Sequence, residues 1–238
     1  MARPRIALLN AAHEPGPTRR NFRREVDADL VEYHLPGGDR PETFDVDAAI
    51  VTGSRASVYW DEPWIDEAAA WTREAVDRGM PFLGICFGHQ FLADVLGGTV
   101  EAMGEYEIGY REVEQTADTP LFEGLDERFT VFTTHSDRVV DLPPGADRLA
   151  ENDYGIHGFR TESVFGVQAH PEYDMASAER VTLAKDDQLD PATIDAVLDG
   201  IDEANYAAAC EAKRIFENFL GVVRSSEVEA GGSVAADD

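Results

Sequence analysis

The first candidate for chemistry in this sequence is a cysteine that lies between two glycines. Residues 81–88 read PFLGICFG, so Cys86 follows a short apolar run and precedes the apolar-periodic segment 87–98. A G-x-C-x-G pattern between a strand and a helix is the thiol form of the nucleophile elbow, a strained turn where flanking side chains would collide. The helix N-terminus behind such a turn favours a thiolate and leaves the Phe87 N–H free to bind an oxyanion. Taken alone, the pattern also fits a small buried residue that ends a strand.

A candidate base for this cysteine lies downstream, in FGVQAHPEYD (165–174). His170 and Glu172 are two positions apart, so in an extended segment their side chains leave from the same face. A carboxylate beside an imidazole orients the ring and stabilises its charged form, as a cysteine nucleophile requires of its base. An isolated H-P-E is typical of a surface turn. A preceding β run and the upstream elbow favour the catalytic interpretation.

The elements that must position these residues alternate between strand and helix patterns in the first hundred residues. The strand patterns are 5–12, 29–36, 45–54 and 81–86, and the helix patterns are 18–27, 61–79 and 87–98. Such alternation predicts an α/β fold with a central, mostly parallel sheet flanked by helices. Strand-like segments separated by turns then predict an added small antiparallel sheet up to about residue 172. Residues 190–222 return to a helical pattern, which predicts a helical C-terminus.

Length and hydropathy predict one domain over residues 1–224, followed by a flexible acidic tail over residues 225–238. Apolar runs are too short for a membrane span, and the N-terminus has no long apolar region of the signal-peptide type. We therefore expect a cytoplasmic protein. The two cysteines, Cys86 and Cys210, form neither a disulfide framework nor a metal-ligand set, and Cys210 is interpreted as a packing residue. We expect no metal and no cofactor.

The charge is strongly acidic, with 47 acidic against 20 basic residues and a net charge of −27. The acids are spread along the whole chain, in the manner of proteins from salt-loving archaea. At molar salt the Debye length is about 3 Å, so such self-repulsion is screened. An acidic mesophilic protein is the alternative. The same charge argues against a nucleic-acid partner, which requires a basic surface.

Three motifs together carry a family resemblance: TGSRASVY (52–59), GICFGHQ (84–90) and HPE (170–172). In this order they resemble the class I glutamine amidotransferases, particularly stand-alone members similar to the glutaminase part of GMP synthetase. The resemblance covers roughly residues 45–175 and implies a flavodoxin-like fold. It also implies that Cys86, His170 and Glu172 form a catalytic triad, and that Gly53 joins Phe87 in the oxyanion hole.

The same resemblance implies a set of substrate contacts. Gln90 matches the family position that contacts substrate glutamine. EYEIGY (105–110) and THSD (134–137) match stretches that line the family's glutamine pocket, which implies contacts from Glu107, Ile108, Ser136 and Asp137. Asp137 fits a turn acid equally well. Arg55 stands where many relatives have proline, which puts the rigidity of that loop in question.

The function implied is hydrolysis of the glutamine side-chain amide through a γ-glutamyl thioester. No nucleotide-binding loop of a synthetase is present, and about 66 residues follow Glu172, so we expect ammonia to reach a separate acceptor enzyme. The alternative is a stand-alone γ-glutamyl peptide hydrolase, because that bond presents the same acyl group. A non-enzymatic regulator is disfavoured by the intact motifs. The sequence leaves open the acceptor, the oligomeric state and the role of the C-terminal helices.

Overall fold

The computed structural model describes residues 3–233 and contains a nine-stranded sheet. The strands are β1 (Arg5–Asn10), β2 (Asp29–His34), β3 (Ala48–Val51), β4 (Phe82–Ile85), β5 (Thr99–Gln115), β6 (Arg128–Asp141), β7 (Asp147–Asn152), β8 (Gly155–Thr161) and β9 (Val164–Val167). The helices are α1 (Pro15–Glu25), α2 (Pro63–Asp77), α3 (Phe87–Val95), α4 (Met175–Leu183), α5 (Pro191–Asp199), α6 (Glu203–Ala209) and α7 (Arg214–Ser233).

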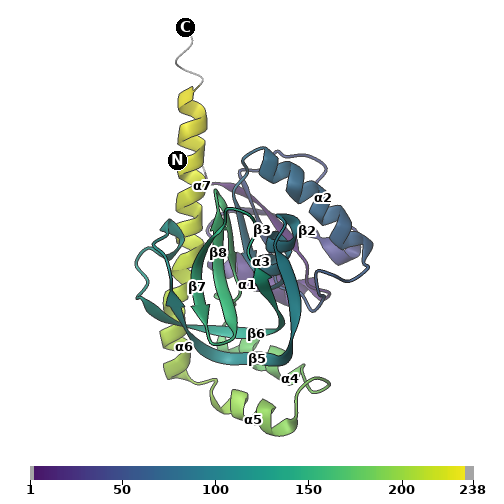
Figure 1. Ribbon diagram of the computed structural model, residues 1–238, viewed down its shortest axis with the longest axis vertical. Helices are drawn as coiled ribbons and strands as arrows, with labels where there is room; N and C mark the ends of the chain where they lie inside the picture. The colour runs from purple at the N-terminus through teal and green to yellow at the C-terminus, as the bar shows by residue number, and fades with distance from the viewer. Residues whose placement is uncertain (1–2, 234–238) are drawn as a thin grey trace.

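The sheet has a parallel half and an antiparallel half. Its strand order is β2-β1-β3-β4-β9-β8-β7-β5-β6, and the first five strands are parallel. The predicted mostly parallel sheet with flanking helices is thus confirmed. The antiparallel strands continue the same sheet, although β5 joins β7 only through Glu114 and Gln115. The long strands β5 and β6 curve across the lower end of the molecule (Figure 1).

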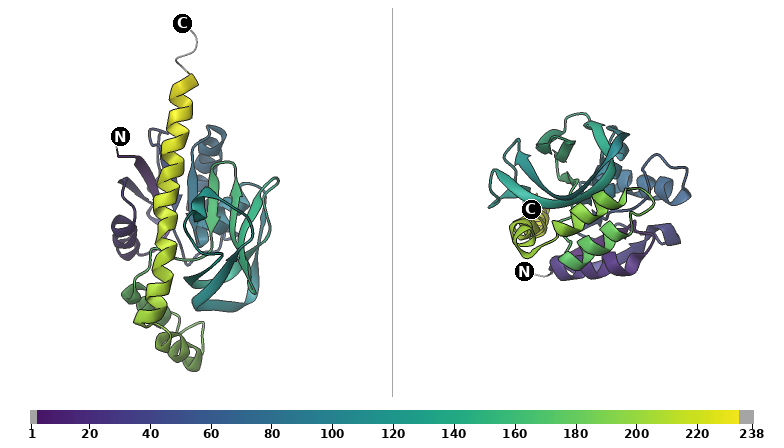
Figure 2. Two further views of the ribbon diagram at one scale, coloured as in Figure 1. Left: turned by 90° about the vertical axis from the view of Figure 1, so that its left-hand side faces the viewer. Right: turned by 90° about the horizontal axis from the view of Figure 1, so that it is seen from below.

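Helices cover both faces of the parallel half, because its strands are apolar on both sides. In β1, Ile6 and Leu8 face one core, which α1 and α7 complete. Ala7 and Leu9 face the other core, which α2 and α3 complete. The long helix α7 runs along the sheet in Figure 1 and in the left-hand view of Figure 2. The site described below lies at one edge of this layered body.

The C-terminal part differs in detail from the sequence expectation. Helix α7 runs through Ser233, so the segment expected to begin a flexible tail at residue 225 continues as helix. The rest of that expected tail, residues 234–238, lies outside the described residues. Strand β7 and helix α4 have no counterpart among the predicted elements. Among the described helices, none combines the length and the apolar character that a membrane span requires.

Helix α3 packs so closely against the sheet that no side chain fits at Gly84 or Gly88. A Cβ on Gly88 would lie 2.2 Å from the carbonyl oxygen of Val51, at the end of β3. A Cβ on Gly84 would lie 2.3 Å from the carbonyl oxygen of Gly88. Both contacts are far shorter than any real carbon–oxygen contact. The glycines on either side of Cys86 are therefore required by the approach of α3 to β3 and β4.

We predict that Gly88→Ala destabilises the protein by about 1–3 kcal/mol or more, because the new methyl group meets backbone that cannot yield. Gly221→Ala is the matched control, since a Cβ at this position of α7 meets no atom within 4 Å. The control should raise the free energy of unfolding by about 0.5–1 kcal/mol, as alanine does in a helix interior. Urea unfolding measures both changes. Wild-type stability in Gly88→Ala would contradict the packing argument.

Candidate active site

Three neighbouring parallel strands end at the same edge of the sheet and deliver the candidate residues there. Cys86 follows β4 directly, Gly53 follows β3, and His170 follows β9. The carboxyl ends of parallel strands are where ligands bind in α/β folds. A cavity of about 450 Å³ lies at this edge, and Cys86, Gly53 and His170 all line it.

The backbone of Cys86 is strained in the manner that the G-x-C-x-G pattern predicts. Its φ is 54° and its ψ is −103°, a conformation that costs free energy in a non-glycine residue. The Cys86 N–H donates to the Val167 carbonyl at 2.9 Å, and the Cys86 carbonyl accepts from the Gln90 N–H at 3.1 Å. These bonds fix the turn between β4 and α3. They hold a buried thiol, 4% exposed, at the cavity wall.

His170 and Glu172 form a buried pair beside Cys86. Nδ1 of His170 lies 2.8 Å from Oε1 of Glu172. Burial opposes a charge on the ring, but the Glu172 carboxylate and the Cys86 sulfur outweigh it and raise the pKa of His170 to about 10. Within residues 3–233, no hydrogen bond reaches Glu172 Oε2, so this carboxylate serves His170 alone. The ring therefore holds its proton at neutral pH.

The segment that carries this pair is fixed on several sides. The His170 N–H donates to the Phe132 carbonyl at 2.9 Å. The ring of Tyr173 stacks on the imidazole, with centroids 4.2 Å apart and planes 15° apart. Arg24 of α1 donates to the Glu172 carbonyl at 2.7 Å and pairs with Asp174 at 2.7 Å. The imidazole is thus positioned by contacts from α1, β6 and its own loop.

Gly53 lies against both catalytic candidates. A Cβ there would be 2.8 Å from Cε1 of His170 and 3.7 Å from Cβ of Cys86. Only glycine leaves room for the imidazole at this point. Phe87 does not line the cavity with its side chain, which packs between Trp64 and Phe91. Its N–H begins α3, where helix donors have no partner within the helix.

Three of the predicted substrate contacts line the cavity: Gln90, Ser136 and Asp137. The Gln90 amide donates to the Asp137 carbonyl at 2.9 Å. The Asp137 carboxylate accepts from the hydroxyls of Ser57 and Tyr59. Asp137 therefore connects the loop after β3 to strand β6. This role differs from the two that the sequence suggested for it, a substrate contact and a turn acid.

The other two predicted contacts, Glu107 and Ile108, do not line this cavity. Ile108 packs in a small apolar cluster with Phe132 and Ala178. Glu107 is fully buried on the opposite side of β5 from its neighbour Tyr106, which does line the cavity. The motif match indicated the correct strand, but alternation along that strand turns Glu107 away.

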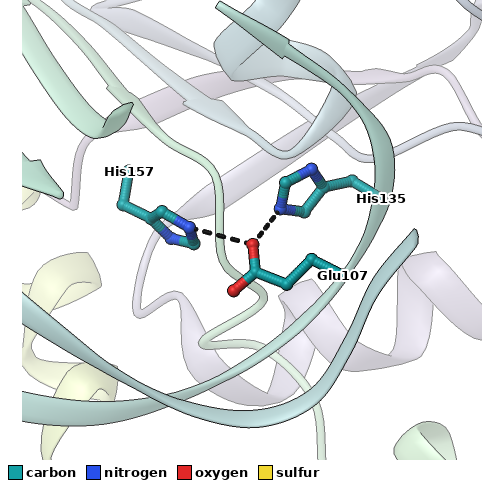
Figure 3. A group of neighbouring side chains, drawn as sticks. All are labelled: Glu107, His135 and His157. Carbon is teal, nitrogen blue, oxygen red and sulfur yellow. Dashed lines mark hydrogen bonds and ion pairs between the residues drawn. The ribbon is translucent and has the colours of Figure 1, made fainter. Parts of the chain in front are cut away.

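Glu107 instead binds two histidines and an asparagine (Figure 3). Its Oε2 lies 2.6 Å from Nε2 of His135 and 3.0 Å from Nε2 of His157, and its Oε1 accepts from Asn152 at 2.7 Å. Burial opposes the charge, but the hydrogen bonds from His135 and His157 outweigh it and hold the pKa of Glu107 well below its usual range. The Nδ1 of His135 faces the Asp137 carbonyl at 2.9 Å, which can only accept. His135 is thus held at both ring nitrogens, by the Glu107 carboxylate and by the Asp137 carbonyl.

This cluster has donor types that zinc also uses, a carboxylate and two imidazoles. Both Nε2 atoms instead lie within hydrogen-bond distance of the carboxylate, so the geometry fits a buried hydrogen-bonded cluster. The cluster contacts the cavity wall through the Asp137 carbonyl, which lies 2.9 Å from Nδ1 of His135 and accepts from Gln90. It therefore fixes the wall segment 134–137 from behind.

The structure places three basic residues on the cavity wall that the sequence did not assign to it: Arg55, Arg180 and Lys185. Arg55, which stands where many relatives have proline, donates to the Ala184 carbonyl at 2.7 Å. This hydrogen bond connects the Arg55 loop to the end of α4. Lys185 is 7% exposed. The one signal for Lys185 in the sequence is its rarity, since the chain has only two lysines.

Comparison with known proteins gives consistent similarities. Residues 18–187 match the family described as glutamine amidotransferase class-I. The chain is 41% identical over 124 residues to a glutamine-hydrolysing GMP synthase of Thermomicrobium roseum, covering 52% of this chain and 23% of the relative. It is 33% identical over 132 residues to the enzyme of that name from Vibrio vulnificus, covering 54% and 25%. The chain thus spans about a quarter of the length of these curated relatives.

Solved structures show the same fold over nearly the whole chain. A glutamine amidotransferase from Thermotoga maritima matches with a TM-score of 0.79 and 25% identity, covering 92% of this chain and 99% of that one. A glutamine amidotransferase from Methylobacillus flagellatus matches with a TM-score of 0.75 and 20% identity, covering 93% and 96%. The second likeness concerns the fold alone.

We predict that Glu107→Gln lowers the free energy of unfolding by about 1–3 kcal/mol, because it removes the buried carboxylate to which His135 and His157 are hydrogen-bonded. Glu112→Gln on the same strand is the control, since Glu112 makes only an exposed ion pair with Arg128. The control should change stability by less than about 1 kcal/mol. The difference from wild type should shrink as pH falls below about 4, where the carboxylate of the unfolded chain is protonated. Equal effects of the two substitutions in urea unfolding would refute a stabilising role for the buried Glu107 carboxylate.

The charge of His170 makes the stability of the protein depend on pH. Because folding raises the pKa of His170 to about 10, its charged form stabilises the native state fully below about pH 6.5. That contribution is lost as pH rises from about 6.5 through about 10. The stability difference between wild type and His170→Gln should therefore be largest at pH 6 and shrink toward pH 10. A difference that stays constant with pH would contradict a charged His170.

Proposed function

Because the chain belongs to the class-I glutamine amidotransferase family, we propose that it hydrolyses the side-chain amide of glutamine through a γ-glutamyl thioester on Cys86. One observation carries the proposal. A buried cysteine on a strained turn shares a cavity with a histidine that is held, and kept protonated, by a carboxylate. This arrangement is that of a nucleophile, an acid–base group and its orienting group.

In the first half-reaction the Cys86 thiolate attacks the amide carbonyl carbon, and a carbon–sulfur bond forms. The negative charge that develops on the carbonyl oxygen is stabilised by the N–H groups of Phe87 and Gly53. The tetrahedral adduct collapses as protonated His170 gives its proton to the leaving nitrogen. Ammonia departs and the thioester remains. The Glu172 carboxylate stabilises the charged ring before the transfer and fixes its orientation throughout.

In the second half-reaction His170 is neutral and acts as a base. It takes a proton from a water molecule that attacks the thioester carbonyl, and the same two N–H groups stabilise the oxyanion. The carbon–sulfur bond breaks, glutamate leaves, and the thiolate and protonated imidazole are restored. The stacked ring of Tyr173 keeps the imidazole in plane while its charge changes.

We further propose that the ammonia serves an acceptor enzyme. The relatives described as glutamine-hydrolysing GMP synthases are about four times as long as the region they share with this chain, and their names join glutamine hydrolysis to a synthesis. The single domain over residues 1–224 would then be the glutaminase component. The dispersed acidic charge supports a cytoplasmic, salt-adapted protein, so assays belong at molar potassium chloride.

The proposal predicts that the protein releases glutamate from glutamine and that Cys86→Ala abolishes this release while leaving the fold intact. Cys210→Ala is the matched control, because Cys210 lies outside the cavity and its loss should leave turnover unchanged. Coupled glutamate detection measures turnover, and thermal unfolding checks the fold. Turnover at the wild-type rate in Cys86→Ala would refute the assigned nucleophile.

The same assay separates the proposed function from its alternative. Glutamine turnover that is low alone and rises with a co-purified partner is expected for an ammonia-delivering glutaminase. Efficient cleavage of γ-glutamyl dipeptides by the protein alone, with little turnover of glutamine, would instead identify a γ-glutamyl peptide hydrolase using the same triad.

A further inference from the structure

Lys185 occupies an unusual position for a lysine in this chain. It lies two residues beyond the end of α4 and lines the cavity together with Cys86 and Tyr106. The residue is more than nine-tenths buried, with 7% of its surface exposed. Its backbone is anchored, because its N–H donates to the Thr182 carbonyl and its carbonyl accepts from the N–H groups of Gln188 and Leu189. The ammonium group is therefore held at the wall of the cavity.

The ammonium group has no acidic partner. Within the described part of the chain, no carboxylate lies within ion-pair distance of its Nζ and no hydrogen bond from it is formed. Its Nζ lies 4.9 Å from the ring centroid of Tyr106, a favourable cation–π contact. The other lysine, Lys213, follows the usual rule for partly buried charges and pairs with Glu25 at 2.6 Å. In a chain with a net charge of −27, an unpaired buried cation is conspicuous.

The surroundings make the ammonium group costly to bury without a partner. Burial and the nearby Arg55 guanidinium lower the pKa of Lys185, and the weaker opposing effects of the Cys86 sulfur and the Asp187 carboxylate do not offset them. Of the two acids that line the cavity, Asp137 is engaged by Ser57 and Tyr59, and Glu14 is exposed. A buried charge is stabilised only by a counter-charge and hydrogen bonds. Among the described residues, none supplies a counter-charge in direct contact with Nζ, so the site is suited to an anion that enters the cavity.

We propose that Lys185 is the carboxylate-binding residue of this cavity and takes the α-carboxylate of a γ-glutamyl substrate whose amide carbonyl lies at Cys86. The inference rests on the proposed function. The α-carboxylate is the group that distinguishes a γ-glutamyl substrate from a simple amide. A carboxylate is the anion that both glutamine and γ-glutamyl peptides carry at this end. Arg55, on the loop that also holds Gly53, supplies further positive charge to the same wall.

The test compares two amides that differ only in this group: L-glutamine, and 4-aminobutanamide, which lacks the carboxylate. Lys185→Gln should lower kcat/KM for glutamine by roughly 10- to 100-fold, chiefly through KM, since a hydrogen bond to a charged group is lost. Turnover of 4-aminobutanamide should not change. Lys185→Arg should restore most of the loss. Lys213→Gln is the matched control and should leave both substrates unaffected, because its partner Glu25 lies outside the cavity.

Two results would overturn the proposal. One is an unchanged preference for glutamine over 4-aminobutanamide in Lys185→Gln. The other is an equal loss for both amides with slower alkylation of Cys86 by iodoacetamide, which would assign Lys185 to thiolate stabilisation. Thermal unfolding of each variant confirms that the fold is kept.

A binding measurement keeps this test separate from the proposed function. Calorimetric titration of the Cys86→Ala protein with glutamine, with and without Lys185→Gln, needs no turnover. Absent glutamate release from wild type would refute the proposed function, whereas tight glutamine binding that persists in Cys86→Ala/Lys185→Gln would refute carboxylate recognition alone. We expect the second substitution to weaken binding roughly 10- to 100-fold.

Discussion

The approach of α3 to the ends of β3 and β4 is the constraint on which the site depends. Cys86 adopts a positive φ that a side chain disfavours, and it can do so because the two neighbouring glycines let the backbone of α3 contact the backbone of both strands directly. A looser contact would let the turn relax into an ordinary strand end. The thiol would then leave the cavity edge, and the first N–H of α3 would no longer lie beside it. Strain at one residue is thus sustained by packing over a whole strand–helix unit.

Two buried carboxylates near the cavity each hold a histidine, and each pair fixes a different wall. Glu172 holds His170, and Glu107 holds His135, which in turn bonds the Asp137 carbonyl. The first pair presents an imidazole to the cavity, and the second supports the wall segment 134–137. Because a buried carboxylate is costly to leave without its hydrogen bonds, each pair resists displacement of its segment. The exception is Lys185, whose charge the protein leaves for a ligand.

Much of the fold could be predicted because local signals agreed with the tertiary structure. Strand–helix alternation and the glycines around Cys86 specify the parallel half and the elbow. In β5 it was harder to predict which side chains face the cavity. Tyr106 and Glu107 are adjacent polar residues, and the face that each occupies depends on the irregular pairing of β5 with β6. The sequence of α4 has no strong hydrophobic periodicity, so no helix was predicted there. The position of Lys185 therefore could not be inferred from the sequence. Contacts between segments distant in sequence, such as Arg24 with Glu172, have no local signature at all.

The proposed contact at Lys185 has to operate within a strongly acidic chain. Glutamine is a zwitterion with no net charge at neutral pH, so the net charge of −27 neither attracts nor repels it appreciably at long range. Recognition of its carboxylate therefore depends on direct contacts in the cavity. At molar salt the Debye length is about 3 Å, so the distant surface acids are screened while a direct contact at Nζ of Lys185 is affected far less. Such a contact can thus operate at the ionic strength that suits the acidic surface.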